Sequence, residues 1–281
     1  MVCIASACFV MFILCFLLTR EHLKTVSTVS VGSDFKSLLS NKPWWLLIGA
    51  ALCSNLFNTV RGATVAYFFL DIIGTEVYMS FFGLAFLFYA GLFLGIGEVS
   101  NMAGVALCVP IANKLGKKTT FIFVNAALLV LSVAFFFVPV SPTGFWLMLV
   151  LQVVISIFTG IMSPLIWSMY ADVSDYAELK FHTASTGLIF SSASMAQKFG
   201  GAIGGAAVLW LLSGFGYVTD AAQLEAGVTQ PESALMVLRW LMSFIPAAVA
   251  ALAIIVVWFY PLTTERIEEI GSELKKIRSI E

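Results

Sequence analysis

Long apolar runs dominate this sequence and leave it few folds to adopt. Seven such runs are separated by polar connections: 1–18, 44–70, 78–111, 119–138, 144–169, 184–213 and 234–260. Each comes close to or exceeds the roughly 20 apolar residues that an α-helix needs to cross a bilayer. Only 11% of the residues are charged and 60% are apolar, so the chain cannot surround itself with the charged surface of a soluble domain. The sequence therefore predicts an all-α, polytopic membrane protein with seven transmembrane helices.

The composition also excludes several classes of function. A formal net charge of −1 leaves no basic stripe for a nucleic acid, so we expect no nucleic-acid partner. The cysteines lie in apolar runs without a CxxC pair, and the two histidines, His22 and His182, are far apart in the chain. Neither pattern is typical of a metalloenzyme. We expect no enzyme activity and no cofactor, and the sequence identifies no metal ligands.

Lysine and arginine placement predicts how the spans are oriented. Alternate connections and the tail hold 12 of the 15 basic residues, whereas connections 71–77, 139–143 and 214–233 hold none. Short loops rich in lysine and arginine stay on the cytoplasmic side of a membrane. The C-terminus is therefore predicted to be cytoplasmic, in a multi-pass protein of the inner (plasma) membrane.

Three ionisable residues stand out inside the predicted spans, where each costs about 2.5–3.5 kcal/mol unless a partner or water stabilises it. Lys198 lies 14 residues into the run 184–213, too deep for its side chain to reach either surface. We expect it to have a buried partner or to border a water-filled path. Arg61 and Glu98 occupy two other spans, and Glu98 could bind a proton or a cation, or neutralise one of the two basic residues.

Further polar and aromatic residues extend this set of candidates for a substrate and cation site. Gln197 is next to Lys198, and Asn101 follows Glu98 by one helical turn. Tyr67 and Trp167 could stack on a sugar ring, although packing alone explains both rings better. The glycines of the same span, at small-xxx-small spacing, predict close packing against a neighbouring helix: Gly200, Gly201, Gly204 and Gly205.

Two sequence motifs carry a family resemblance. The segment Asn113-Lys114-Leu115-Gly116-Lys117-Lys118 resembles the D-R-x-G-R-R loop of the major facilitator superfamily, with asparagine in place of the acidic residue. The stretch Tyr170 to Glu178, which contains ADVSDYAE, followed by Ala196-Gln197-Lys198, strongly resembles the glycoside-pentoside-hexuronide:cation symporters, the family of the melibiose carriers. Arg61 with Tyr67, and Tyr260-Pro261-Leu262, fit the same family.

The resemblance implies that the seven spans correspond to helices 6–12 of a major facilitator fold. Residues 1–18 would then correspond to helix 6, in full or truncated form. Residues 19–43 would form the central cytoplasmic loop, and residues 44–260 would form the C-terminal six-helix bundle. In residues 261–281, apolar side chains at helical spacing predict a cytoplasmic amphipathic helix, lying on the membrane or, as we favour, capping the bundle. Most of the N-terminal bundle, with the family's cation-binding aspartates, is missing from such a chain.

The resemblance also implies roles for particular residues. Lys198 would stand at the sugar and cation site. Asp172, Asp175 and Glu178, spaced to share one side of a helix, would form a cytoplasmic gate with the other bundle, although solvated loop acids are the alternative. Because the predicted span ends at residue 169, these three acids are expected in the connection that follows it.

Together the sequence and the resemblance favour cation-coupled sugar symport by alternating access, from a partial chain. Its partners would be a sugar or glycoside, the lipid bilayer and the missing N-terminal bundle, and the coupling ion would be sodium or a proton. The alternative is a membrane fragment or half-transporter subunit that does not transport and only packs against a partner bundle.

Overall fold

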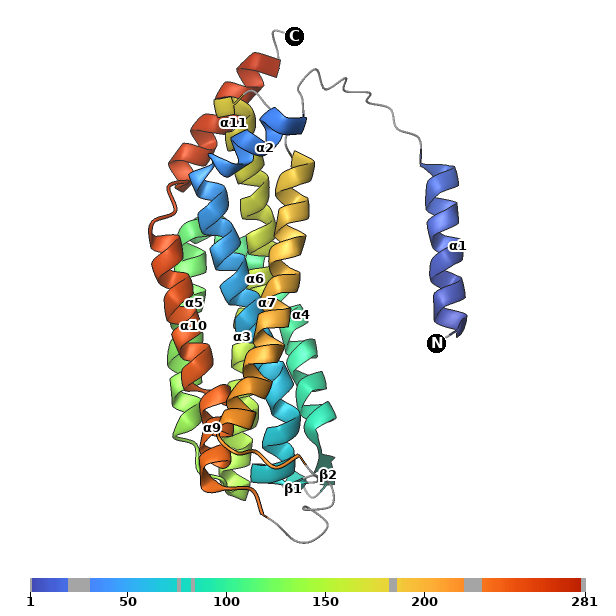
Figure 1. Ribbon diagram of the computed structural model, residues 1–281, viewed down its shortest axis with the longest axis vertical. Helices are drawn as coiled ribbons and strands as arrows, with labels where there is room; N and C mark the ends of the chain where they lie inside the picture. The colour runs from blue at the N-terminus through green and yellow to red at the C-terminus, as the bar shows by residue number, and fades with distance from the viewer. Residues whose placement is uncertain are drawn as a thin grey trace.

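The computed structural model describes residues 2–19, 31–74, 77–81, 84–181, 186–219 and 229–278, which leaves His22 and His182 outside the described residues. Its helices form one elongated bundle, with α1 standing apart from it (Figure 1). The described elements are α1 (Val2–Leu18), α2 (Val31–Leu39), α3 (Lys42–Phe68), η1 (Phe69–Ile73), β1 (Val77–Phe81), β2 (Leu84–Phe88), α4 (Ala90–Leu115), α5 (Lys117–Phe136), α6 (Pro142–Phe181), α7 (Thr186–Gly214), α9 (Glu232–Met242), α10 (Phe244–Trp258) and α11 (Thr264–Arg278).

The predicted all-α membrane architecture is confirmed. Six helical stretches of the described chain are long and apolar enough to cross a membrane: Lys42–Ile73, Ala90–Leu115, Lys117–Phe136, Pro142–Phe181, Thr186–Gly214 and Glu232–Trp258. The first apolar run forms α1, whose 17 residues make it shorter than any of these six. The predicted count of seven spans is therefore approximate.

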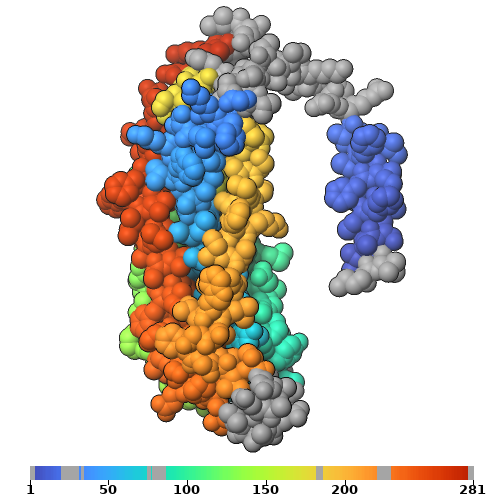
Figure 2. All heavy atoms as spheres, viewed as in Figure 1, coloured from blue at the N-terminus to red at the C-terminus, as the bar shows by residue number. Residues whose placement is uncertain are grey.

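Helix α1 differs from the others in its surroundings. Its side chains from Ile4 to Leu18 are all exposed, and the space-filling view shows it separate from the bundle (Figure 2). A helix that is apolar on every side has no water-facing stripe, so lipid or another apolar surface is the environment that suits it.

Close helix pairs hold the bundle together, and glycines allow the closest approaches. Gly200 and Gly204 of α7 are buried against α3, where a Cβ on Gly204 would lie 2.9 Å from the Thr59 Cβ. Between α4 and α6, a Cβ on Gly104 would overlap the carbonyl oxygen of Ile157. The predicted glycine packing in α7 is thus confirmed for Gly200 and Gly204. A Cβ placed on Gly205 would meet no atom of a neighbouring element within 4 Å.

The core of the bundle divides into two clusters along its length. One lies at the end where α2 and α11 meet the bundle and includes Leu47, Phe121, Met169 and Val173. The other lies toward the end with β1 and β2 and is rich in phenylalanine: Phe68, Phe69, Phe88, Phe93, Phe135 and Phe145. The pocket described below lies between α3, α4 and α6, which contribute side chains to both clusters.

The structure differs from the predicted helices at three places. The run 78–111 does not form one helix, because Val77–Phe81 and Leu84–Phe88 pair as an antiparallel hairpin and α4 begins only at Ala90. Both strand segments are rich in aromatic and β-forming residues, and periodicity does not separate short apolar strands from helices. The last span is also broken, at Ser243 (φ −131°, ψ −82°), into α9 and α10.

The third correction concerns the acidic stretch after residue 169. It is not a connection, because α6 continues through it without interruption to Phe181. The tail forms α11, and its Ile270 and Leu274 are only 2% and 4% exposed within the bundle's core cluster. Of the two interpretations of the tail, packing as a cap on the bundle is the one that these contacts favour.

Candidate substrate site

Arg61 points from α3 into the interior of the bundle and is 5% exposed. Its Nη1 donates to the carbonyl oxygen of Met242 at 2.6 Å, and its Nη2 donates to Oε1 of Gln152 at 2.9 Å. The guanidinium carbon also lies 5.2 Å from the centre of the Phe135 ring. Arg61 therefore links four helices, α3, α5, α6 and α9.

The break in the last span explains why Met242 offers a carbonyl to Arg61. The last carbonyls of a helix have no partner within the helix. Helix α9 ends at Met242, one residue before the non-helical Ser243. A buried carbonyl without a partner would cost about 1–3 kcal/mol, so the Arg61 guanidinium satisfies a group that the break leaves open.

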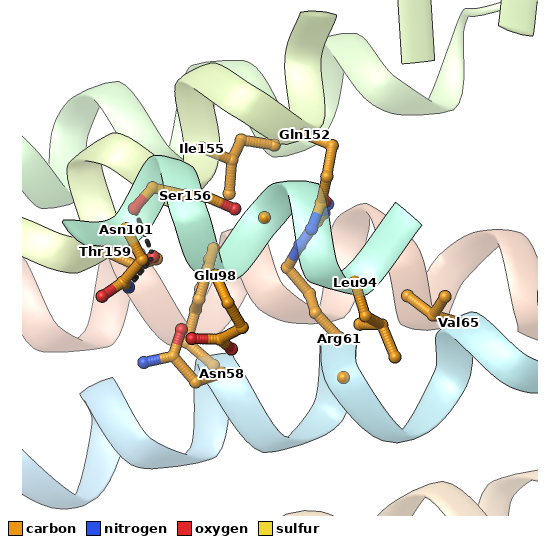
Figure 3. A pocket seen from close by; sticks show the side chains of 13 residues that line it. Asn58, Arg61, Val65, Leu94, Glu98, Asn101, Gln152, Ile155, Ser156 and Thr159 are labelled. Carbon is orange, nitrogen blue, oxygen red and sulfur yellow. Dashed lines mark hydrogen bonds between the residues drawn. The ribbon is translucent and has the colours of Figure 1, made fainter. Parts of the chain in front are cut away.

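A polar pocket of about 290 Å³ lies beside Arg61, between α3, α4 and α6 (Figure 3). Glu98 and Asn58 are exposed in it, and Asn101 donates from Nδ2 to Oγ1 of Thr159 at 3.3 Å. The residues that line it are Phe57, Asn58, Arg61, Gly62, Val65, Leu94, Gly97, Glu98, Asn101, Gln152, Ile155, Ser156 and Thr159. Three of the sequence candidates, Arg61, Glu98 and Asn101, thus meet at one place.

The pocket chemistry suits a hydroxylated ligand better than a metal ion. Among the described residues no group of three or more His, Cys, Asp or Glu side chains could hold a metal. Within the pocket lining, Glu98 is the single carboxylate, and the remaining polar groups are amides, hydroxyls and Arg61. Amide and hydroxyl groups can both donate and accept hydrogen bonds, as sugar hydroxyls do.

Lys198 lies outside this pocket. It is exposed on α7, whereas the neighbouring Ala196 and Gly200 are buried on the side of α7 that packs toward α3. Gln197 is half-buried. The expectation that Lys198 has a buried partner was wrong for the described part of the chain, because its side chain is exposed there and makes no hydrogen bond or ion pair.

Tyr67 and Trp167 do not line the pocket, and both rings pack against other aromatic rings. Tyr67 lies edge-on to Tyr217 at 5.5 Å between ring centres, and the Tyr217 hydroxyl donates to Asp71 at 2.6 Å. Burial, reinforced by this carboxylate, raises the pKa of Tyr217 above its ordinary value, so the hydroxyl remains a donor. Trp167 stacks on Phe190 with ring centres 5.9 Å apart.

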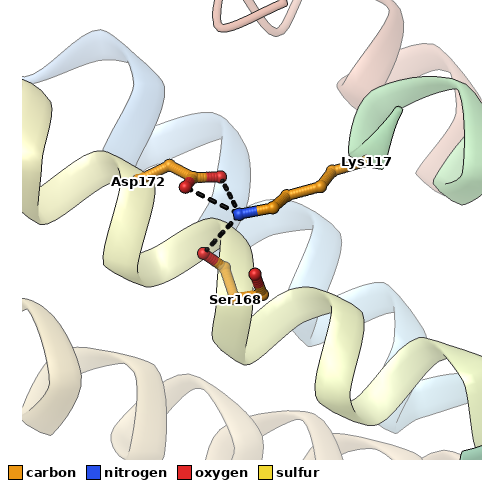
Figure 4. Close-up of polar contacts among 3 residues, drawn as sticks. All are labelled: Lys117, Ser168 and Asp172. Atoms are coloured by element: carbon orange, nitrogen blue, oxygen red, sulfur yellow. Dashed lines mark hydrogen bonds and ion pairs between the residues drawn. The ribbon is translucent and has the colours of Figure 1, made fainter. Parts of the chain in front are cut away.

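The end of the bundle near α11 carries an ion pair that sequence reasoning missed. Lys117 Nζ lies 2.7 Å from both carboxylate oxygens of Asp172 and donates to the Ser168 carbonyl at 3.4 Å (Figure 4). The adjacent Lys118 donates to the carbonyl oxygens of Trp258 at 2.9 Å and Tyr260 at 2.7 Å. The two lysines therefore attach the start of α5 to α6 and to the end of α10.

Of the three predicted gate acids, Asp172 is buried and already paired within its own bundle. Asp175 is exposed and Glu178 is half-buried. Because α6 is helical here, all three lie on one continuous helix. The solvated-loop alternative does not describe Asp172.

Gln152 is one of four polar pocket residues that sequence reasoning did not identify, together with Asn58, Ser156 and Thr159. It is an amide within the apolar run 144–169, where an uncharged polar residue carries a smaller insertion penalty than a charge does. It is the single carboxamide side chain of that run, and this was the available signal.

Comparison with known proteins gives a consistent relationship over nearly the whole chain. Residues 1–264 match the family described as MFS/sugar transport protein. The chain is 30% identical over 269 residues to the inner membrane symporter YicJ of Escherichia coli. This alignment covers 95% of this chain and 54% of that protein. It is 28% identical to the glucuronide carrier protein homolog (99% of this chain, 57% of that protein) and 28% identical to the putative glycoside/cation symporter YagG (96% and 55%), both from E. coli. The chain spans about half the length of these relatives.

Proposed function

Because the chain belongs to the MFS sugar transport family, we propose that it supplies the C-terminal bundle of a cation-coupled sugar or glycoside symporter. In this proposal the six long spans act as helices 7–12 and pair with an N-terminal bundle. The two bundles rock against each other around a site between them, as in other transporters built from repeats. The coupling ion is sodium or a proton.

The observation that carries this proposal is the polar pocket within apolar spans. Ionisable residues are rare in transmembrane helices and mark substrate or ion pathways. Arg61, Glu98 and Asn101 come from helices α3 and α4, yet they line a single pocket. In our proposal Glu98 and Asn101 contact the sugar, and Arg61 supports the pocket from inside the bundle.

Lys198 has a different role in the proposal. Its exposure on α7 leaves the ammonium group available to the partner bundle and to water between the two. There it would lie near the sugar and cation site with Gln197. Coupling requires that the sugar and the cation favour the same state of the protein, which a charge shared between their sites can provide.

The proposed orientation places the end with α11 in the cytoplasm. Lys117, Lys118 and the basic residues of α11 lie at that end, consistent with the preference of basic loops for the cytoplasmic side. Asp175 and Glu178 would then face the N-terminal bundle as a cytoplasmic gate, while Asp172 holds Lys117 within its own bundle.

Uptake of labelled sugars into vesicles tests this function. The full chain is reconstituted with and without an N-terminal bundle from the relatives, and uptake is measured with sodium, proton or no gradients. We expect gradient-dependent uptake only with both bundles. Gradient-dependent uptake by the Lys198→Ala variant should be about 10- to 100-fold lower, the range expected when a hydrogen bond to a charged group is removed.

The matched control is Lys275→Ala, which removes an exposed lysine of α11 and should leave uptake unchanged. Full uptake by Lys198→Ala would remove Lys198 from the site. No uptake in any arm, with both bundles inserted, would favour the alternative of a subunit that does not transport.

A further inference from the structure

The orientation of the Gln152 side chain is fixed by its neighbour. Gln152 is 8% exposed, and its Oε1 accepts the hydrogen bond from Arg61 Nη2 at 2.9 Å. An arginine side chain only donates hydrogen bonds. The amide group of Gln152 must therefore turn its oxygen toward Arg61, and its NH2 group must point elsewhere.

The NH2 group of Gln152 lies at the wall of the pocket, next to a glycine. A Cβ placed on Gly97 would lie 2.8 Å from Gln152 Nε2 and 3.0 Å from Ser156 Oγ. All three residues line the pocket (Figure 3). The absence of a side chain at Gly97 thus leaves room for the two polar groups, the Gln152 amide and the Ser156 hydroxyl.

Arg61 itself is already engaged. Both of its terminal nitrogens donate to protein carbonyl oxygens, one on Met242 and one on Gln152. Glu98, the carboxylate of the same pocket, would repel a ligand anion. Together these groups offer a ligand one oriented NH2 donor and one carboxylate acceptor.

We propose that Arg61 is a positioning residue that holds the Gln152 amide so that its NH2 group donates to a substrate oxygen in the pocket. The substrate oxygen belongs to an uncharged, polyhydroxylated ring, and another of its hydroxyls donates to Glu98. Sugar hydroxyls meet both requirements because each can donate and accept. This inference rests on the proposed function and narrows it to the neutral part of a sugar or glycoside at this pocket.

The Gln152→Glu variant separates positioning from packing. Its carboxylate has nearly the same shape and still accepts from Arg61, but it has no NH2 group to donate. With both bundles reconstituted, we expect the KM for sugar uptake to rise about tenfold, with the maximal rate little changed. This pattern is expected because the lost hydrogen bond stabilises the bound sugar and the transport step equally. The matched control, Gln230→Glu, changes a glutamine that bonds the Val218 backbone outside the pocket and should keep the KM.

A second pair of measurements keeps the inference testable if Gln152→Glu does not insert. Gly97→Ala retains every polar group but pushes on Gln152 Nε2, and we expect a severalfold rise in KM. A series of singly deoxygenated sugars should contain one analogue that loses affinity for the wild-type chain but has the same KM for wild type and Gly97→Ala. A merely structural role for Gln152 would weaken all analogues alike.

The outcomes distinguish this inference from the function on which it rests. Gradient-driven uptake with an unchanged KM in Gln152→Glu, or in Gly97→Ala where the first variant does not insert, would overturn the role of Gln152 and leave the transport proposal standing. Preference for a carboxylated over a neutral sugar, lost in Gln152→Glu, would overturn the neutral substrate class. No sugar uptake by the wild-type pair of bundles would overturn both proposals.

Discussion

Arg61 and Lys198 are both basic residues inside apolar helices, yet the bundle treats them in opposite ways. Arg61 is buried, and two carbonyl oxygens accept hydrogen bonds from it. Lys198 is exposed on α7, and within the described part of the chain no side chain or carbonyl pairs with it. The described bundle therefore supplies hydrogen-bond partners for Arg61 and leaves Lys198 exposed.

The two cations obtain their stabilisation from different surroundings. An ionisable group within a membrane requires polar surroundings, and Arg61 obtains them from α6 and α9 of its own bundle. Lys198 must obtain them from water, a second bundle or a ligand. The first arrangement predicts a role in stability, and the second predicts a role in interaction and transport.

Replacement of Arg61 should have the largest effect on stability. Arg61→Met leaves the Met242 carbonyl and the Gln152 amide oxygen without a donor, and each buried unsatisfied group costs about 1–3 kcal/mol. We expect the free energy of unfolding of the full chain to fall by about 2–5 kcal/mol. Denaturation in mixed micelles, followed by tryptophan fluorescence, measures it, and an unchanged midpoint would contradict the linking role of Arg61.

The Lys117–Asp172 pair should have the next largest effect. The Lys117 side chain is 28% exposed, so the pair is partly screened by solvent. We expect Lys117→Met to lower the free energy of unfolding by about 1–3 kcal/mol, mostly because the Asp172 carboxylate is left unpaired. Asp172→Asn combined with Lys117→Met should cost less than the sum of the single changes. Additive costs in this double-mutant cycle would mean that the two side chains do not interact.

Asp175, an exposed residue of the proposed gate, should have a smaller effect, and on conformation rather than folding. Asp175→Asn removes an exposed charge, and exposed ion pairs are worth about 0.2–1 kcal/mol. In the assembled transporter we expect the population closed to the cytoplasm to fall by up to about fivefold. Cysteine accessibility from the cytoplasmic side reports this population, and equal accessibility in both forms would refute a gating role.

Lys198 should have the smallest effect on the stability of the chain itself. Lys198→Met removes an exposed charge without a partner in the described chain, so the free energy of unfolding should change by less than about 0.5 kcal/mol. The same micelle denaturation provides the comparison with Arg61→Met. A loss as large as that of Arg61→Met would show that Lys198 stabilises its own bundle and would remove the contrast.

The sequence predicted the spans well because burial in lipid demands long apolar runs, and those are visible without a structure. It did not predict the break at Ser243 or the pairing of Val77–Phe81 with Leu84–Phe88. Both lie in apolar segments whose composition suits a continuous helix equally well. Tertiary contacts decide such cases, as the hydrogen bond from Arg61 to the Met242 carbonyl illustrates.

The site was predicted in part. Charges stand out in an apolar sequence, so Arg61, Glu98 and Lys198 were found, but only the structure shows that Arg61 and Glu98 share a pocket and that Lys198 does not. Gln152 and the Lys117–Asp172 pair were missed. Their importance depends on partners 91 and 55 residues away in the sequence, which a single sequence does not reveal.

Protection of a pocket cysteine by sugar measures directly whether sugar enters the pocket between α3, α4 and α6. Asn58 lines it and is exposed, so Asn58→Cys, in a chain without its native cysteines, places a thiol there. A hydrophilic thiol reagent should label this cysteine in the assembled transporter, and a transported sugar should slow the labelling. Val130→Cys, 63% exposed on α5, should face lipid and stay unlabelled. Labelling of Asn58→Cys at the same rate with and without sugar would contradict the account.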